Sequence, residues 1–177
     1  KASIESSGIW ADLGTGSGCI AVALARSLSK WEGKVVDCCP NALALAERNL
    51  NRLTSKKGFQ LHIGNWWEPL YSYWGLIDLA VCNPPYIPEG HLIDLEPVVR
   101  DHEPHLALSG GWDGMNHLRI VIEGALKALK PGGWLFLEHQ HDQSDDVLAL
   151  MANYGLGEIS CALDLNRIPR FAMGRRS

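Results

Sequence analysis

Asn83-Pro84-Pro85-Tyr86 is the segment of this sequence whose residue types are best suited to chemistry. An amide or aromatic amino nitrogen is a poor nucleophile because its lone pair is delocalised. To methylate such a nitrogen, a protein must hold both N–H bonds so that the lone pair faces the methyl donor. The Asn83 side-chain oxygen can accept one hydrogen bond, and a backbone carbonyl fixed by rigid proline can accept the other. Tyr86 offers a flat face to a planar group. The alternative is a Pro-Pro turn that merely ends a strand.

A glycine cluster precedes this segment in Asp12-Leu13-Gly14-Thr15-Gly16-Ser17-Gly18. Glycines let a backbone turn tightly and approach a ligand closely. The spacing is G-x-G-x-G, so the dinucleotide fingerprint G-x-G-x-x-G is not met, and no P-loop lysine follows. Asp37 ends the next apolar run, where a carboxylate can accept both ribose hydroxyls of a nucleoside. The pattern favours a nucleoside cofactor over a plain turn with Asp37 as a helix cap.

Alternating short and long apolar runs predict the elements that must position these residues. Seven strands are expected at 8–13, 34–38, 59–63, 76–82, 134–138, 158–163 and 170–174. Four helices are expected at 19–29, 40–52, 115–129 and 144–153, with Pro40 at the first turn of the second. Lys130-Pro131-Gly132-Gly133 is expected to stop the third helix, and 87–114 to form a long irregular, functional stretch.

Strand and helix in alternation predict a Rossmann-like α/β fold. We expect a seven-stranded, mostly parallel sheet with helices on both faces and a C-terminal antiparallel hairpin. Residues 1–177 are expected to form a single domain. Ligands of such sheets bind beyond the carboxyl ends of the strands, the edge at which Gly14, Asp37, Trp66 and Asn83 are expected.

Composition narrows the class of protein. The chain has 177 residues, 46% of them hydrophobic, which excludes disorder. Its net charge of −4 argues against a protein that grips phosphate backbones, and charges or prolines interrupt every apolar run that could span a membrane. The five cysteines show no metal or disulfide spacing and suit reduced thiols in the cytoplasm. The chain begins with Lys1, and we expect it to be a piece of something longer.

Together these motifs resemble the peptide chain release factor glutamine N5-methyltransferases, a family of class I S-adenosylmethionine-dependent enzymes. The resemblance also includes His102-Glu103-Pro104-His105-Leu106-Ala107-Leu108, Gly110-Gly111-Trp112-Asp113-Gly114, Lys130-Pro131-Gly132-Gly133-Trp134 and Arg170-Phe171-Ala172. It covers the chain from about Gly8 to its end. Enzymes that methylate amines of DNA bases share the Asn-Pro-Pro-Tyr tetrapeptide, so the Glu-Pro-x-x-Ala-Leu stretch and the glycines after it make the resemblance specific.

The resemblance implies a role for each motif. Gly14, Thr15, Gly16, Ser17 and Gly18 would wrap the methionine part of S-adenosylmethionine, Asp37 would hold its ribose, and Trp66 would pack near its adenine. Asn83, Pro84, Pro85 and Tyr86 would grip the substrate glutamine, with Asn83 standing between cofactor and substrate. The implied partner is a release factor in the cytoplasm, without direct contact to nucleic acid or membrane.

Three departures from the family pattern bear on this expectation. Asn65 stands where an acid usually precedes the tryptophan, and Ser109 stands where aspartate usually precedes the glycine pair. The family's helical N-terminal domain, which helps to recognise the release factor, is absent from this chain. These departures keep a non-catalytic binding module open as an alternative.

Other functions are less well supported by the residues. A DNA adenine-N6 methyltransferase is disfavoured by the acidic charge balance and by the lack of a target-recognition domain. The glycine spacing argues against a dehydrogenase, because it does not match the dinucleotide-binding fingerprint. Glu138-His139-Gln140-His141-Asp142 could suggest a metal site on a strand, but the family that the motifs resemble needs no metal, and we expect none.

Overall fold

The computed structural model describes residues 7–55, 58–102 and 104–177. It contains seven β-strands: β1 (Ile9–Leu13), β2 (Glu32–Asp37), β3 (Phe59–Ile63), β4 (Ile77–Cys82), β5 (Leu129–Glu138), β6 (Leu156–Leu163) and β7 (Pro169–Arg176). Four longer helices connect them: α1 (Cys19–Ser27), α2 (Pro40–Leu53), α5 (Asn116–Ala128) and α6 (Ser144–Asn153). Each of these elements lies within a few residues of its predicted position.

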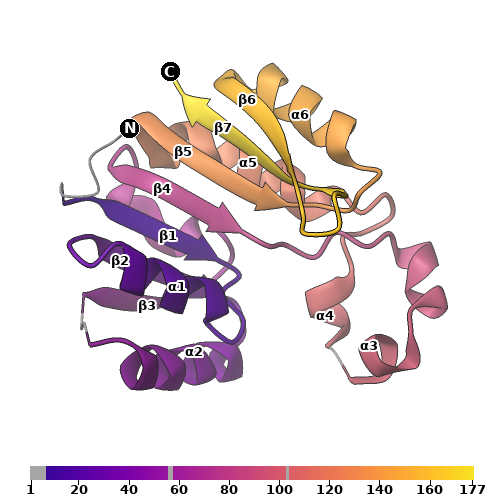
Figure 1. Cartoon of the computed structure of the whole chain (residues 1–177), viewed down its shortest axis with the longest axis horizontal. Coiled ribbons are helices and arrows are strands. Elements are labelled where there is room, and N and C mark those ends of the chain that lie inside the picture. Colours follow the sequence, from indigo (N-terminus) through magenta and orange to yellow (C-terminus); the bar gives the residue numbers. More distant parts are fainter. Residues whose placement is uncertain (1–6, 56–57, 103) are drawn as a thin grey trace.

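The strands form one seven-stranded sheet in the order β3-β2-β1-β4-β5-β7-β6 (Figure 1). The pairs from β3 through β5 are parallel, whereas β7 runs antiparallel to both β5 and β6. The predicted mostly parallel sheet with a C-terminal antiparallel hairpin is therefore confirmed. The order reverses between β1 and β4, which is where ligands bind in open α/β sheets.

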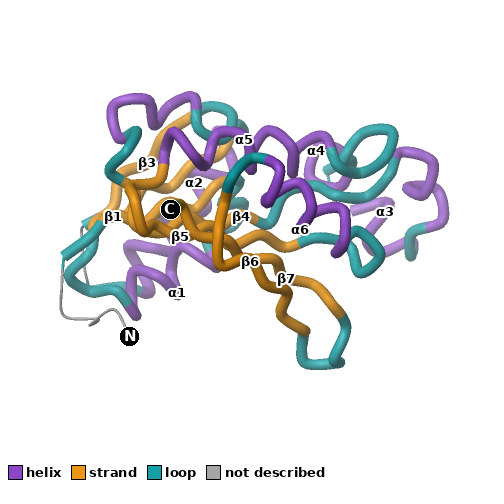
Figure 2. Tube along the Cα trace, turned by 90° about the horizontal axis from the view of Figure 1, so that it is seen from above, coloured by secondary structure: helices purple, strands orange, loops and turns teal. Residues whose placement is uncertain are grey.

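Hydrophobic clusters cover both faces of this sheet. On one face Trp10 and Val35 pack with residues of α1 and α2, and on the other Leu13 and Ile77 pack with residues of α5 and α6. Figure 2 shows α1 on one side of the sheet and α5 and α6 on the other. This arrangement follows from the alternation of side chains along a strand. Among the residues that the structure describes, no helix is long and apolar enough to cross a membrane.

The stretch from 87 to 114 is more ordered than the sequence predicts. It holds the 3₁₀ helix η2 (Glu89–Asp94) and two short helices, α3 (Pro97–His102) and α4 (His105–Leu108), which extend away from the sheet in Figure 1. The base of the excursion is closed by backbone hydrogen bonds from Ile87 N to Leu108 O (3.1 Å) and from Gly110 N to Ile87 O (2.8 Å). The frequent prolines hide these helices in the sequence because they limit each one to six residues or fewer.

The predicted end of the helix before Lys130–Gly133 is confirmed, since α5 ends at Ala128, but the next strand begins earlier than expected, because β5 starts at Leu129. Leu129 pairs with Ile77, but the next partner pair joins Trp134 to Leu79. The residues between them therefore bulge out of the strand. Gly132 adopts φ +81°, and a Cβ at Gly133 would lie 2.8 Å from the Ile77 carbonyl oxygen. Glycines here permit a bulge within β5.

Four tryptophans of the described residues lie against glycines. A Cβ added at Gly33 would lie 2.2 Å from the Trp10 ring, and one at Gly124 would lie 2.1 Å from Trp67. Gly8 stands in the same relation to Trp31 at 2.8 Å, and Gly14 to Trp66 at 3.1 Å. The indole rings thus occupy the space that other residues would fill with side chains, and they bring the elements into close contact.

Candidate active site

The loop from Gly14 to Gly18 forms the tight turn that its glycines predict. The backbone N–H groups of Gly14 and Thr15 both donate to the Val36 carbonyl oxygen, each at 2.9 Å. Gly14, Gly16 and Gly18 adopt φ values of 71°, 56° and 82°, in the left-handed region that favours glycine. At Gly18, the last residue before α1, a Cβ would lie 2.9 Å from the Ala46 Cα, so this glycine also lets α2 approach.

Asp37 is the last residue of β2, as predicted, and its carboxylate joins the loop to the sheet. Gly16 N donates to Asp37 Oδ2 and Cys39 N donates to Asp37 Oδ1, both at 2.8 Å. The side chain thus orders the turn before α2, but the helix cap itself is Cys39, two residues later. It also borders a cavity, and each oxygen keeps a second lone pair for a ligand. The helix-cap interpretation of Asp37 is therefore wrong, and the ribose interpretation stays a prediction.

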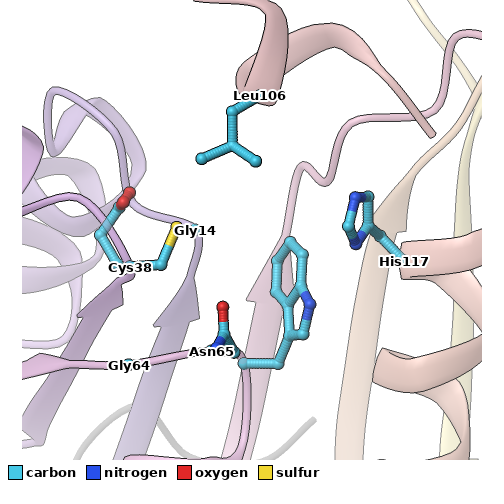
Figure 3. A pocket seen from close by; sticks show the side chains of 8 residues that line it. Gly14, Cys38, Gly64, Asn65, Leu106 and His117 are labelled. Atoms are coloured by element: carbon cyan, nitrogen blue, oxygen red, sulfur yellow. The ribbon is translucent and has the colours of Figure 1, made fainter. Parts of the chain in front are cut away.

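A cavity opens at the carboxyl edge of the sheet, enclosing about 410 Å³ including its mouth. Eight residues line it: Gly14, Asp37, Cys38, Gly64, Asn65, Trp66, Leu106 and His117. Figure 3 shows Leu106 reaching in from α4, and His117 on the side opposite Cys38. The structure thus brings three predicted residues, Gly14, Asp37 and Trp66, to one cavity.

Trp66 forms an aromatic wall of this cavity. It adopts φ 48°, a strained conformation for a bulky residue, and residues so strained cluster at ligand sites. Its ring lies over Gly14 and 5.2 Å from the His117 ring, between centroids. Burial lowers the pKa of His117, which keeps its ring uncharged at neutral pH. The two rings contact each other and together form a wall against which a flat heteroaromatic group can pack.

His117 and Leu106 are among the cavity residues that sequence reasoning missed, together with Cys38 and Gly64. His117 is the second residue of α5 and Leu106 belongs to α4, both far along the chain from the glycine loop. The position of His117 directly after a glycine-rich turn, at a helix start, is the signal that could have identified it. Leu106 gave none, because a leucine on a short helix is indistinguishable from a packing residue.

Two loop residues, Thr15 and Ser17, do not line the cavity but connect the loop to the elements around it. The Thr15 hydroxyl donates to Asp12 Oδ2 at 2.6 Å, and Asp12 is buried at the end of β1. Burial raises the pKa of Asp12 to about 6, although the Thr15 hydrogen bond opposes the rise. Ser17 presents its carbonyl oxygen to Asn49 Nδ2 at 2.8 Å, which ties the loop to α2. The backbone of the loop is therefore held from below.

Asn83-Pro84-Pro85-Tyr86 leaves the end of β4, beside the glycine loop. Leu13 pairs with Cys82, so Gly14 and Asn83 follow neighbouring parallel strands at the same position. Asn83 is exposed, and its amide has no hydrogen-bond partner within the described residues, which leaves both donor and acceptor available. Pro84 is buried and Tyr86 half-buried. Asn83 borders an apolar groove with Phe136 and Phe171, separate from the cavity around Trp66.

The departures from the family pattern have visible local consequences. Asn65 Nδ2 donates to Glu68 Oε2 at 3.3 Å, while Asn65 itself lines the cavity. Ser109 Oγ accepts a long hydrogen bond of 3.3 Å from Gly111 N. Glu103, part of the motif that makes the resemblance specific, lies outside the described residues.

The histidines at 139 and 141 do not lie on a strand as expected, because β5 ends at Glu138. His139 is fully buried, and its Nδ1 lies 2.7 Å from the Gln140 carbonyl oxygen. In the part of the chain that the structure describes, no three His, Cys, Asp or Glu residues gather as metal ligands.

Sequence comparison supports the resemblance seen in the motifs. Residues 2–111 match the family described as methyltransferase small domain. A release factor glutamine methyltransferase of Prochlorococcus marinus is 59% identical over 169 residues, which are 96% of this chain and 58% of that protein. A protein of the same name from Geobacter sulfurreducens is 42% identical, over 93% of this chain and 56% of its own length. The chain thus spans a little over half the length of these curated relatives.

Solved structures share the fold at low sequence identity. A predicted O-methyltransferase from Agrobacterium tumefaciens superposes with a TM-score of 0.69 at 14% identity, over 99% of this chain and 77% of that one. A methyltransferase from Pyrococcus furiosus gives a TM-score of 0.67 at 14% identity, over 98% and 77% of the two chains. At this identity the likeness concerns the fold alone.

Proposed function

Because the chain belongs to the methyltransferase small domain family, we propose that it methylates the side-chain nitrogen of a protein glutamine with S-adenosylmethionine as donor. One observation carries the proposal: the Leu13–Cys82 register sets Asn83 and the Gly14 loop at neighbouring strand ends. An amide-gripping segment thus lies beside a cavity suited to a nucleoside. The names of the similar curated proteins favour a release factor glutamine over a DNA base.

The cofactor would occupy the cavity around Trp66. Gly14, Thr15, Gly16, Ser17 and Gly18 would wrap its amino-acid end with their backbone, and Asp37 would accept the ribose hydroxyls with its remaining lone pairs. Trp66 and His117 would enclose the adenine. When bound, S-adenosylmethionine supplies an electrophilic methyl group on a sulfonium that leaves readily.

The substrate amide would be held by Asn83-Pro84-Pro85-Tyr86. The Asn83 side-chain oxygen accepts one N–H of the glutamine amide, and a proline-fixed backbone carbonyl accepts the other. Tyr86 forms a flat wall beside the amide plane. With both N–H bonds held, the nitrogen lone pair is oriented, and positioning supplies most of the rate. A strong general base is unnecessary, because the methylated nitrogen loses its proton readily.

The protein partner would be a release factor, presenting its Gly-Gly-Gln glutamine in the cytoplasm. Residues 1–177 would act as one catalytic unit in this reaction. Asn65, which lines the cofactor cavity, and Ser109, in the loop after α4, are the positions at which this chain would differ from the family pattern in that reaction.

The test is transfer of label from methyl-labelled S-adenosylmethionine. The chain is incubated with a release factor, with the same factor carrying alanine in place of the Gly-Gly-Gln glutamine, and with duplex DNA. We expect label only in the unchanged release factor, and none when Asn83→Ala replaces the parent chain. Label in DNA would support the adenine alternative, and binding of S-adenosylhomocysteine without any transfer would support a non-catalytic module.

A further inference from the structure

Three side chains from adjacent parts of the sheet edge meet next to Asn83. Tyr86 follows β4, Glu138 ends β5 and Arg170 lies near the start of β7. The Tyr86 hydroxyl donates to Glu138 Oε1 at 3.0 Å and accepts from Arg170 Nη2 at 2.6 Å. Arg170 also pairs directly with Glu138 at 3.2 Å. The hydroxyl thus uses its donor and an acceptor at once.

The triad of Tyr86, Glu138 and Arg170 is partly shielded from solvent, which helps to fix its geometry. The side chains of Glu138 and Arg170 are 24% and 25% exposed, whereas the Glu158–Arg175 pair farther along the hairpin is 59% and 42% exposed. Hydrogen bonds to charged groups are short and strong, and partial burial shields them from water. Burial, followed by the charge of Glu138, raises the pKa of Tyr86, so its hydroxyl stays protonated and remains a donor.

The backbone of Tyr86 is fixed independently. Gln143 is 7% exposed; its Nε2 donates to the Tyr86 carbonyl oxygen at 2.9 Å, and its Oε1 accepts from Gln140 N at 2.9 Å. Gly114 packs so closely that a Cβ there would lie 2.3 Å from the same carbonyl oxygen. With the main chain held in this way, the remaining freedom of Tyr86 includes the swing of its ring about the Cα–Cβ bond, which the triad removes by fixing the hydroxyl.

We propose that Glu138 and Arg170 are positioning residues that lock the Tyr86 ring as a wall of the amide site. The proposal rests on the proposed function, since it assigns the ring to the substrate side of that site. A fixed wall restricts the amide to the orientation in which its lone pair faces the methyl donor. A ring free to swing out of place would let the amide tilt, which lowers the rate of transfer more than it weakens binding.

The test compares kcat and KM for a Gly-Gly-Gln peptide in the full chain and its variants. Glu138→Gln keeps the size of the side chain but removes its charge, and we expect it to lower kcat about 10- to 100-fold with little change in KM. Arg170→Ala should act similarly, and Arg170→Lys should recover part of the loss. Glu158→Gln, which breaks the exposed pair on the same hairpin, is the matched control and should match the parent.

A double-mutant cycle asks whether the pair acts through Tyr86. In a Tyr86→Phe background, where the anchored hydroxyl is gone, Glu138→Gln should change kcat by less than about threefold. Independent, multiplying effects would overturn the proposal, as would variants that turn over like the parent. All variants should bind S-adenosylhomocysteine with parental affinity, which separates positioning from misfolding.

A second measurement does not depend on activity. NMR of tyrosine labelled at Cζ, assigned by the signal lost in Tyr86→Phe, follows the titration of the Tyr86 hydroxyl. We expect Glu138→Gln to lower its pKa, because the neighbouring carboxylate raises it. An unchanged pKa would overturn the positioning contact. A parent chain that transfers no methyl group would instead contradict the proposed function, while this titration still decides the contact.

Discussion

Asp37 provides the sharpest test of the cofactor cavity. The proposed contact is a carboxylate that accepts ribose hydroxyls while it also accepts Gly16 N and Cys39 N at 2.8 Å each. Asp37→Ala removes every acceptor at this position, so the ligand loses its partner and the glycine loop loses one anchor. We expect the affinity for S-adenosylhomocysteine to fall and the chain to remain folded.

The expected loss of affinity in Asp37→Ala follows from the removal of one charged hydrogen-bond acceptor. A hydrogen bond to a charged group contributes about 1.5–3 kcal/mol, which corresponds to a roughly 10- to 150-fold weaker dissociation constant. Asp37 is 9% exposed, so water replaces the lost contact poorly, and the upper part of this range applies. The released backbone of Gly16 adds to the loss, because the loop must then be ordered on binding.

The assay is calorimetry of S-adenosylhomocysteine binding to the parent, to Asp37→Ala and to a matched control. Asp78 serves as the control because its side chain is 13% exposed and its Oδ2 also accepts a backbone hydrogen bond, from Ile9 N at 2.9 Å, at the opposite edge of the sheet. Asp78→Ala should lower the free energy of unfolding without changing ligand affinity. Parental affinity in Asp37→Ala, or equal weakening by both substitutions, would refute the assignment of Asp37 to the ribose.

Three further outcomes are expected. Asn83→Ala should slow single-turnover methyl transfer by about 10²–10³ and leave S-adenosylhomocysteine binding unchanged, because one preorganised hydrogen bond at the reacting nitrogen is lost; a near-parental rate would contradict the amide grip. The raised pKa of Asp12, about 6 against 3.8, means that the folded chain binds more protons than the unfolded chain between these values, so Asp12 lowers stability as pH rises through them. Asp12→Asn removes this loss. The free energy of unfolding of the variant minus that of the parent, measured in urea, should therefore be about 2–3 kcal/mol larger at pH 7.5 than at pH 4. A difference that does not change with pH would be inconsistent with this burial. Gly18→Ala should lower the unfolding free energy by about 1–3 kcal/mol, since φ is 82° and Ala46 Cα lies 2.9 Å from the new Cβ, and an unchanged melting temperature would argue against the tight approach.

The sequence predicts the sheet well because its strands are short apolar runs between helices of strong periodicity. It fails where local signals have two meanings. Lys130–Gly133 carries the proline and glycines that correctly predict the end of α5, but the same residues also form a bulge inside β5, because β4 supplies a partner that no local pattern reveals. The helices α3 and α4 are too short to show a period and are stabilised by the closed base at Ile87 and Gly110.

Some residues of the candidate site could likewise be predicted from the sequence, and others could not. Gly14, Asp37, Trp66 and Asn83 could be placed from the sequence because each follows a strand end, and parallel strands end at one edge. His117 and Leu106 could not, since they reach the cavity through the packing of α5 and α4. The anchoring of Tyr86 by Glu138 and Arg170 likewise depends on β7 lying between β5 and β6, an order that the sequence does not specify.

The contacts between tryptophans and glycines bear on how this molecule can change over generations or in the hands of a designer. Where an indole fills the space above a glycine, as Trp10 does at Gly33, neither residue can be exchanged alone without a clash or a void. The two residues of each pair can therefore be substituted only together, because a larger residue at one position requires a smaller one at the other. The pair of Gly14 and Trp66 lines the cavity and helps to set its width. Reshaping the cavity for a bulkier or slimmer cofactor analogue would thus require compensatory exchange of both residues together.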